Sequence, residues 1–286
     1  MKTMTLVTRS SLVAVALLAA PFLAQVARAA ELRIVITQAQ AGDARKYQAL
    51  LAYLAKEGIP AAFVTAPDNR AAADFFASSQ ADAMFSGSGI AGTLFIKGLA
   101  APLVRPVGVD GVSTYSAVVV APKGSPRFDG AGRYFDGKRV ILAALASAGE
   151  FYFRSVGPSK PAAVLKAASH GAAIDALSRG QADVAVVKNH VWTKEQARYP
   201  GLESVGGDRG ENPDASLIVS KKLDAATAQR ISARLLALEA DRSPEAVAAK
   251  GALAIRGFIP ATAKDFAHTL DLLEKAGVTK DFGYVF

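Results

Sequence analysis

The stretch ADAMFSGSGIAG, residues 81–92, decides the fold of this 286-residue chain. Its apolar residues Ala83–Phe85 predict a short buried strand, because an apolar run bounded by turn residues is typical of a strand covered on both faces. The small residues that follow predict a helix over Gly87–Ile96 that begins directly from a Ser/Gly turn. A strand that runs straight into a helix is the repeating unit of an α/β protein.

Strands and helices alternate on both sides of this stretch. The same apolar periodicity predicts nearby strands at Leu32–Thr37, Ala61–Thr65 and Leu103–Val109, and helices at Asp43–Lys56 and Asn69–Ser79. The alternation then repeats, with strands at Tyr115–Ala121, Arg139–Ala143, Asp183–Val187 and Leu217–Val219, helices at Gly149–Val156 and Gly171–Arg179, and a short strand or helix within Pro161–Ala168. The remainder is predicted to be helical, at Ala225–Ala240, Pro244–Lys250 and Ala263–Ala276.

Two α/β units without a linker between them predict two lobes joined by a hinge of crossing strands. We expect each lobe to be a mostly parallel sheet flanked by helices. The crossings are placed near Ser113–Ser116 and Asn212–Ser216. Residues 30–114 and 215–286 then form lobe one, and residues 115–214 form lobe two.

The first 29 residues are expected to be a cleavable secretory signal. Lys2 and Arg9 precede an uncharged apolar run, Ser11–Ala24, and Ala27 and Ala29 supply the small residues of a signal peptidase site. The alternative is a membrane anchor, but this run is shorter than the roughly 20 residues that a spanning helix needs. The chain has no cysteine, so neither a lipid anchor at the cleavage point nor a disulfide is expected.

Charge and motifs exclude several function classes. The formal charge is +8, and removal of Lys2, Arg9 and Arg28 with the signal lowers it to +5. The remaining basic residues are scattered among acids, which argues against nucleic-acid binding. The sequence has no P-loop, no nucleophile elbow and no H-E-x-x-H motif, and it contains only three histidines. We therefore expect no catalytic residues, no metal site and no cofactor.

Five stretches of the chain, taken in order, resemble one family of transport proteins. They are RIVITQAQAGDARKYQALLAYLAKEGI (33–59), ADAMFSGSGIAG (81–92), STYSAVVVAPKGSP (113–126) with FDGKRV (135–140), SHGAAIDALSRGQADVAVV (169–187) and NPDASLIVSKKLDAATAQRI (212–231). The chain resembles the phosphate/phosphite/phosphonate-type substrate-binding proteins of ABC transporters, which have the two-lobed type 2 periplasmic binding protein fold. The resemblance implies a periplasmic, monomeric protein that is not an enzyme and delivers a small ligand to an ABC permease in the inner membrane.

The helix starts are the first candidate ligand contacts. In a doubly wound sheet, ligands bind at the carboxyl ends of the strands, and in a two-lobed protein those ends face the cleft. Ser86, Ser88 and Gly89 lie there, and free N–H groups at a helix start bind anions; the alternative is that the serines only cap the helix. Ser147 precedes the matching helix of lobe two, again as a contact or a cap. The resemblance implies a richer Ser/Thr/Gly turn at this second position than Ser147 provides.

Other candidates surround the crossings. Tyr115 and Ser116 lie at the first crossing, where ordinary packing is the alternative to a ligand contact. Gln38 follows the first strand and would face the cleft. Tyr47 lies on the next helix, where core packing is an equal alternative.

Charged candidates lie on the side of lobe two. Lys188 and Asn189 follow a predicted strand, and Asp214 lies at the second crossing. The resemblance implies that members binding an amino-phosphonate have a carboxylate near Lys188 and Asn189, so these residues argue against a cationic group on the ligand. Lys188 is alternatively a solvated charge, and Asp214 either receives a hydroxyl or amine or pairs with a lysine.

The ligand itself stays open at this stage. The resemblance favours a phosphorus oxyanion such as phosphonate or phosphite. A larger apolar or lipid-like ligand is the alternative, because the second turn, LASAGEFYF (145–153), is apolar and aromatic. An alternative function is that of a periplasmic sensor that presents its ligand to a membrane receptor.

Overall fold

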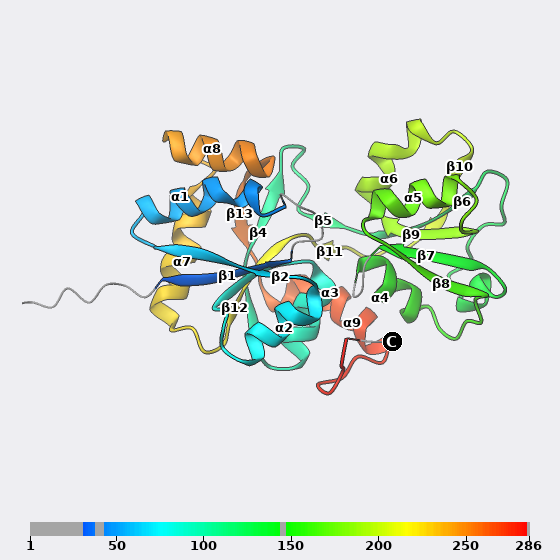
Figure 1. The fold of residues 1–286 in the computed structure, drawn as a ribbon, viewed down its shortest axis with the longest axis horizontal. Helices are drawn as coiled ribbons and strands as arrows, with labels where there is room; N and C mark the ends of the chain where they lie inside the picture. Colours follow the sequence, from blue (N-terminus) through cyan, green and yellow to red (C-terminus); the bar gives the residue numbers. More distant parts are fainter. Residues whose placement is uncertain (1–30, 38–42, 144–146, 285–286) are drawn as a thin grey trace, which may run out of the picture.

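The computed structural model describes residues 31–37, 43–143 and 147–284. They form two α/β lobes, which Figure 1 shows side by side with short strands running between them. The expected signal peptide, residues 1–29, and the candidate Gln38 lie outside the described residues. Among the described residues, no helix has the length and apolar character needed to span a membrane.

Lobe one is built on a sheet of six strands in the order β13-β4-β12-β3-β1-β2. The strands are β1 (Leu32–Thr37), β2 (Ala61–Ala66), β3 (Ala83–Ser86), β4 (Ala100–Gly108), β12 (Ser216–Ser220) and β13 (Ile255–Pro260). The helices are α1 (Gln48–Lys56), α2 (Asn69–Ala77), α3 (Ser88–Ile96), α7 (Ala225–Ala237), α8 (Pro244–Leu253) and α9 (Ala267–Lys275), with 3-10 turns η1 (Asp43–Tyr47) and η4 (Ala263–Phe266). Both faces of the sheet are buried: Ile34 and Ile36 belong to one apolar cluster, and Val35 between them belongs to another.

Lobe two is built on a sheet of five strands in the order β10-β6-β9-β7-β8. The strands are β6 (Ala117–Pro122), β7 (Arg139–Ala143), β8 (Ala163–Ala167), β9 (Val184–Lys188) and β10 (Leu202–Gly207). The helices are α4 (Ala148–Ser155), α5 (His170–Ser178) and α6 (Asn189–Glu195), with 3-10 turns η2 (Gly132–Phe135) and η3 (Gln196–Arg198). Here too, neighbouring residues such as Val186 and Val187 face different clusters.

Two short antiparallel strands join the lobes. They are β5 (Thr114–Tyr115) and β11 (Asn212–Pro213), and Tyr115 pairs with Asn212. Both lie where the sequence predicted the crossings.

The sheets are mixed, so the prediction of mostly parallel sheets was wrong in this respect. β6 and β12 run antiparallel to their neighbours, whereas β1 pairs in parallel with β2 and β3, and β7 with β8 and β9. The cause is the double crossing. A strand that enters a lobe from the junction must run opposite to strands that end there, and β6 and β12 follow directly from β5 and β11.

Two edge strands were not predicted. β13 interrupts the region predicted to be helical, and β10 lies in a region with no predicted element. Their sequences, IRGFIP and LESVGG, contain glycine or proline, and each strand has a register shift where it pairs with its neighbour. Glycine and proline weaken the strand pattern in a sequence but are accommodated at bulged edges of a sheet.

The same arginine–aspartate contact occurs in both lobes. In lobe one, Arg33 at the start of β1 donates from Nε and Nη2 to Asp82, at 2.9 and 2.8 Å. In lobe two, Arg139 at the start of β7 makes the same two contacts with Asp183, at 3.2 and 2.7 Å. Each aspartate also accepts from the backbone N–H of its arginine, so it fixes the register of two parallel strands.

We expect Asp82→Asn and Asp183→Asn each to lower the free energy of unfolding at pH 7 by about 1 kcal/mol, because solvent screens the partly exposed pairs. For Asp82, burial opposes ionisation, but the hydrogen bonds from Arg33 outweigh it and hold its pKa below the usual range. Hydrogen bonds from Arg139 likewise lower the pKa of Asp183. A depressed folded-state pKa means that this stabilisation is present above the unfolded-state pKa, near 4, and is lost as the pH falls through the folded-state value.

Urea unfolding at about pH 7 and pH 3 measures this effect. The difference in the free energy of unfolding between the wild type and each variant should be smaller at the lower pH. Asp175→Asn is the matched control, because it breaks an exposed pair with Arg179 inside one helix. A difference in unfolding free energy that is the same at both pH values would contradict the expectation.

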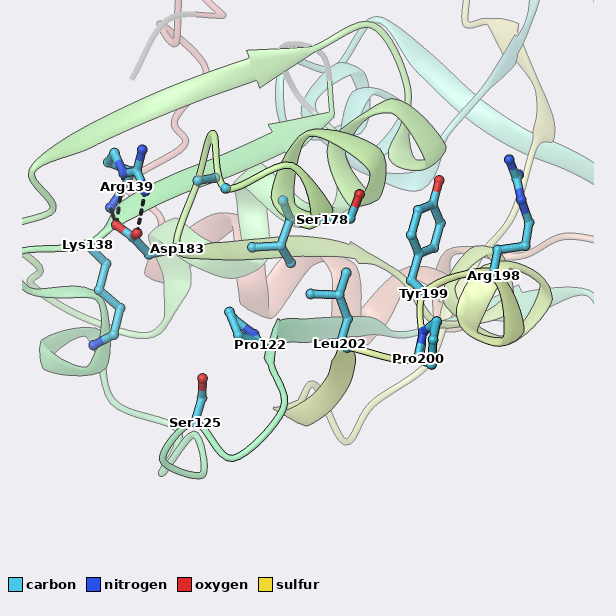
Figure 2. Close-up of a pocket in the computed structure, with 14 residues that line it drawn as sticks. Pro122, Ser125, Lys138, Arg139, Ser178, Asp183, Arg198, Tyr199, Pro200 and Leu202 are labelled. Atoms are coloured by element: carbon cyan, nitrogen blue, oxygen red, sulfur yellow. Dashed lines mark hydrogen bonds and ion pairs between the residues drawn. The ribbon is translucent and has the colours of Figure 1, made fainter.

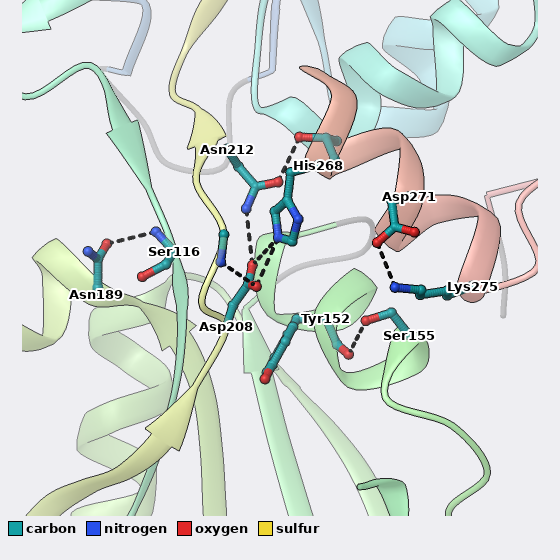
Figure 3. A network of polar contacts seen from close by, with 11 residues as sticks. Ser116, Tyr152, Ser155, Asn189, Asp208, Asn212, His268, Asp271 and Lys275 are labelled. Atoms are coloured by element: carbon teal, nitrogen blue, oxygen red, sulfur yellow. Dashed lines mark hydrogen bonds and ion pairs between the residues drawn. The ribbon is translucent and has the colours of Figure 1, made fainter. Parts of the chain in front are cut away.

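Helix α9 connects the lobes a third time. It follows β13 of lobe one and packs against α3 of lobe one and α4 of lobe two. Leu273 belongs to an apolar cluster of lobe one, and Leu272 belongs to a cluster of lobe two. Figure 3 shows α9 beside α4, with His268 of α9 pointing toward Asp208.

Candidate functional site

A cavity of about 180 Å³ opens where lobe one faces the junction. It lies at the carboxyl ends of β1 and β3, the position that ligands occupy in doubly wound sheets. Four of the predicted site residues contribute to its wall, and they come from both lobes and from the junction. The residues that line it are Ile36, Lys46, Tyr47, Phe85, Ser86, Gly87, Lys188, Asp214 and Ala215.

The start of α3 forms one wall of the cavity. Gly87 is the N-cap residue, and in the described part of the chain no side chain caps the helix. The first turn contains no acidic residue. Ser86 directs its hydroxyl to the carbonyl oxygen of Gly87, at 3.0 Å. The free N–H groups and the helix dipole therefore favour an anion at this end.

Tyr47 and Lys46 also line the cavity. Tyr47 stacks on Phe85 with ring centroids 4.9 Å apart and meets Phe63 edge-on at 5.7 Å. Tyr47 therefore both packs in the core and lines the cavity. The Lys46 ammonium lies 5.3 Å from the centroid of the Tyr47 ring. Among the described residues, no carboxylate forms an ion pair with Lys46, so it brings positive charge to the cavity.

Lys188 and Asp214, which both line the cavity, form an ion pair. Lys188 Nζ donates to Asp214 Oδ1 at 2.5 Å and lies 4.4 Å from the centroid of the Tyr115 ring. The two side chains are only 17% and 26% exposed. Burial opposes ionisation of Asp214, but the charge and hydrogen bond of Lys188 outweigh it and lower the pKa of Asp214. The pair is therefore ionised and neutral overall.

Two histidines lie near this pair, and sequence reasoning did not place them there. His190 Nε2 is 3.7 Å from Asp214 Oδ2. His170 begins α5, and its buried Nδ1 has no hydrogen-bond partner among the described residues. Burial, with repulsion from Lys188, lowers the pKa of His170 to about 3, and burial also lowers the pKa of His190 in spite of Asp214. Near neutral pH, His170 is uncharged.

The remaining predicted residues make contacts within the protein. The buried Ser88 hydroxyl is hydrogen-bonded to the Tyr115 hydroxyl, and burial raises the pKa of Tyr115. Gly89 lies inside α3, where its carbonyl oxygen accepts from Thr93 Oγ1 at 2.9 Å. Ser88, Gly89 and Tyr115 are not among the described residues that line the cavity. A contact between them and a ligand stays a prediction.

The polar candidates of lobe two are also engaged. Asn189 accepts from the Ser116 backbone N–H at 3.1 Å and donates its own N–H to the Ser116 carbonyl oxygen at 2.9 Å, as Figure 3 shows in part. Ser147 caps α4 by accepting from the Glu150 backbone N–H at 3.3 Å. In this structure, Ser147 therefore makes the helix-capping contact that was named as the alternative to a ligand contact. Among the described residues, no group of three or more His, Asp or Glu side chains is placed to bind a metal ion.

A larger cavity, of about 620 Å³, lies at the far end of lobe two (Figure 2). It is at the amino ends of β7 and β9, opposite the ends that face the junction. Its basic groups already have partners: Arg139 pairs with Asp183, and Arg198 pairs with Glu195. The smaller cavity at the junction is therefore the better candidate for a ligand site.

Residues 34–266 match the sequence profile of the family described as "ABC transporter, phosphonate, periplasmic substrate-binding protein". The chain belongs to this family. Membership implies a small ligand and an ABC transporter, and it makes this family member a binding protein rather than an enzyme. No curated protein sequence matches the chain.

Solved structures of low identity share the fold. XAC2383 from Xanthomonas citri bound to ATP is 19% identical, with a TM-score of 0.71 over 88% of this chain and 96% of that one. PhnD1 from Prochlorococcus marinus in complex with methylphosphonate is 15% identical, with a TM-score of 0.65 over 86% and 98%. A binding protein component of an ABC phosphonate transporter from Pseudomonas aeruginosa is 14% identical, with a TM-score of 0.64 over 85% and 86%. These matches confirm the predicted two-lobed type 2 periplasmic binding protein fold.

Proposed function

We propose that this family member binds a phosphorus oxyanion, such as a phosphonate or phosphite, at the junction of its lobes and delivers it to an ABC permease. One observation carries the proposal: the uncapped start of α3 and the Lys46 ammonium border the same cavity. A helix N-terminus and a lysine together supply directed N–H donors and charge for an oxyanion.

The size of the cavity favours a small ligand. Its volume of about 180 Å³ is below the roughly 300–1,000 Å³ typical of pockets for drug-sized ligands. The aromatic residues that suggested an apolar or lipid-like ligand, Phe151, Tyr152 and Phe153, are buried in the apolar clusters. That alternative therefore loses the side chains that motivated it.

The ligands of the relatives also support an anion. PhnD1 of Prochlorococcus marinus was solved with methylphosphonate, and XAC2383 of Xanthomonas citri with chloride and with ATP. All three are anions, although they differ widely in size.

The working cycle follows from the fold and the expected export signal. Residues 1–29 act as the signal that directs the chain to the periplasm, where it works as a monomer. The two bodies that close on the ligand are residues 30–114 with 215–286, and residues 115–214. The strands β5 and β11 act as the hinge between them.

Calorimetry and small-angle scattering test this function. Phosphate, phosphite and methylphosphonate are compared with decanoate as a lipid-like probe, and we expect micromolar binding of at least one phosphorus oxyanion together with a decrease in the radius of gyration. Lys46→Gln should weaken that binding about tenfold, the effect of losing one charge-assisted hydrogen bond. Lys123→Gln, on the exposed surface of lobe two, is the control. Binding of decanoate alone would contradict the proposal.

A further inference from the structure

We propose that Asp110 of lobe one and Lys194 of lobe two form an ion pair when the lobes open, and that this pair holds the open arrangement until a ligand closes it. The approach of the two side chains is a property of the fold. Only its effect on ligand affinity rests on the proposed function.

The two residues border a second cavity between the lobes, the hinge cavity, which has a volume of about 260 Å³. Lobe one contributes the end of β4, the turn that follows it and the start of β13, and lobe two contributes α6. The first crossing borders the cavity at Ser113 and Thr114. In Figure 1, the turn after β4 and helix α6 face each other across the junction. The hinge cavity therefore lies between the two bodies that move in the proposed cycle.

The hinge cavity and the ligand cavity, which is the cavity of about 180 Å³ at the ends of β1 and β3, lie on opposite sides of the second crossing. Asp214 and Ala215, which directly precede β12, line both cavities. In the sheet, β12 lies between β4, which borders the hinge cavity, and β3, which borders the ligand cavity. On lobe two, Lys188 lines the ligand cavity, and the helix that follows it lines the hinge cavity. A rotation about this crossing that widens the ligand cavity therefore narrows the hinge cavity.

Two opposite charges face the hinge cavity from opposite lobes. Asp110 and Lys194 both line it, and both residues are exposed. Among the described residues, neither of them forms an ion pair. Burial lowers the pKa of His190, and Lys194 and Asp110 are near enough to change it in opposite directions. The other carboxylate of the cavity, Asp214, is already paired with Lys188. Asp110 and Lys194 are therefore the charges that can pair when the gap between the lobes narrows.

Each of these charges is attached to a rigid part of its own lobe. In the turn after β4, the Gly108 N–H donates to the Val112 carbonyl oxygen at 2.8 Å, and the Val112 N–H donates to Asp110 Oδ1 at 3.1 Å. In α6, Trp192 is buried in an apolar cluster of lobe two and anchors the helix that carries Lys194. The two charges therefore approach each other when one lobe moves relative to the other.

A reversible cross-link tests this approach. The chain has no cysteine, so Asp110→Cys combined with Lys194→Cys introduces a single possible intramolecular disulfide. It can form only if the lobes bring the two Cα atoms within about 7 Å of each other. We expect the disulfide to form on oxidation, and we expect the radius of gyration to be larger than in the same protein reduced with dithiothreitol. The single-cysteine variants, oxidised in the same way and separated from any disulfide-linked dimer, are the controls and should keep the radius of the wild type.

Calorimetry with methylphosphonate links the cross-link to the ligand cavity. The oxidised double-cysteine protein should bind it at least about tenfold more weakly than the reduced protein, because a protein locked open lacks the closed, binding-competent form. Reduction with dithiothreitol should restore the affinity.

The charge of Lys194 is tested separately with Lys194→Gln. Long-range electrostatics alone predicts weaker binding of an anion, because a positive charge is lost. Loss of the ion pair predicts the reverse, because the open form is destabilised and more of the protein can close. We expect Lys194→Gln to bind methylphosphonate about two- to fivefold more tightly, the range for an exposed ion pair. Lys123→Gln, also an exposed lysine of lobe two, is the matched control and should not tighten binding.

The outcomes separate this inference from the proposed function. Absence of the intramolecular disulfide, or a radius of gyration that the cross-link leaves unchanged, would overturn the inference. Weaker binding of methylphosphonate by Lys194→Gln would overturn it as well. A wild type that binds neither methylphosphonate nor phosphite would count against the proposed function, while the disulfide and the radius of gyration would still decide whether Asp110 and Lys194 meet.

Discussion

Gly149→Ala is expected to lower the free energy of unfolding by about 3 kcal/mol, the upper end for an added methylene in a packed interior. Gly149 lies in the first turn of α4, directly against β9. A Cβ atom at this position would be 2.1 Å from the Val186 carbonyl oxygen and 2.9 Å from its carbonyl carbon. Because these atoms belong to the backbone of a central strand, they cannot rotate away, and the substitution must displace α4 from the sheet of lobe two.

Gly251→Ala is the matched control and should have the opposite sign. Gly251 lies within α8, and a Cβ atom there would have no neighbour within 4 Å. Alanine in an open helical position should raise the stability by about 0.5–1 kcal/mol, because it lowers the conformational entropy of the unfolded chain. Urea unfolding of both variants measures the contrast. Similar small effects in the two variants would show that α4 does not sit rigidly on β9.

The sequence predicted the α/β alternation because apolar periodicity depends on local burial. It could not predict strand direction, because β12 has the same apolar pattern whether it runs parallel or antiparallel to β3. The direction depends on the chain crossing between lobes twice. The strand β13 was missed for a different reason, since Gly257 and Pro260 are poor strand residues that only an edge position accommodates.

Part of the cavity lining could be predicted from where a residue lies in the order of strands and helices. Ser86, Lys188 and Asp214 were chosen because they lie at predicted carboxyl ends of strands or at a crossing. Tyr47 was chosen as a residue of the helix that follows the first strand, and all four line the cavity. Lys46 was missed because an exposed lysine in a helical stretch has no distinguishing pattern. Its position directly before Tyr47 was the one available signal.

The partners of these residues could not be read from the sequence. Lys188 and Asp214 are 26 positions apart, and both the solvated and the paired alternatives were consistent with their residue types. Only the antiparallel pairing of β5 with β11 brings the second crossing beside the end of β9. The ion pair between Lys188 and Asp214 therefore depends on tertiary structure.

The second large effect is expected for Asp208→Ala, which should lower the free energy of unfolding by about 3 kcal/mol. The Asp208 side chain is 4% exposed and accepts from the Gly210 backbone N–H at 3.0 Å, from Asn212 Nδ2 at 3.3 Å and from His268 Nε2 at 2.9 Å (Figure 3). Alanine leaves these donors without their acceptor, and an unpaired buried donor costs about 1–3 kcal/mol.

Loss of the Asp208 carboxylate should also weaken the contact that α9 makes with lobe two, the third connection between the lobes. Asn212 also links Asp208 to α9, because its Nδ2 donates to Asp208 and its Oδ1 accepts from Thr269 of α9 at 2.7 Å. Asp271→Ala is the control on the same helix: its pair with Lys275 is exposed, and breaking such a pair costs about 0–0.5 kcal/mol. Small-angle scattering of the unliganded proteins should give a larger radius of gyration for Asp208→Ala than for Asp271→Ala. Equal stability and equal radii for the two variants would mean that α9 does not restrain the lobes through Asp208.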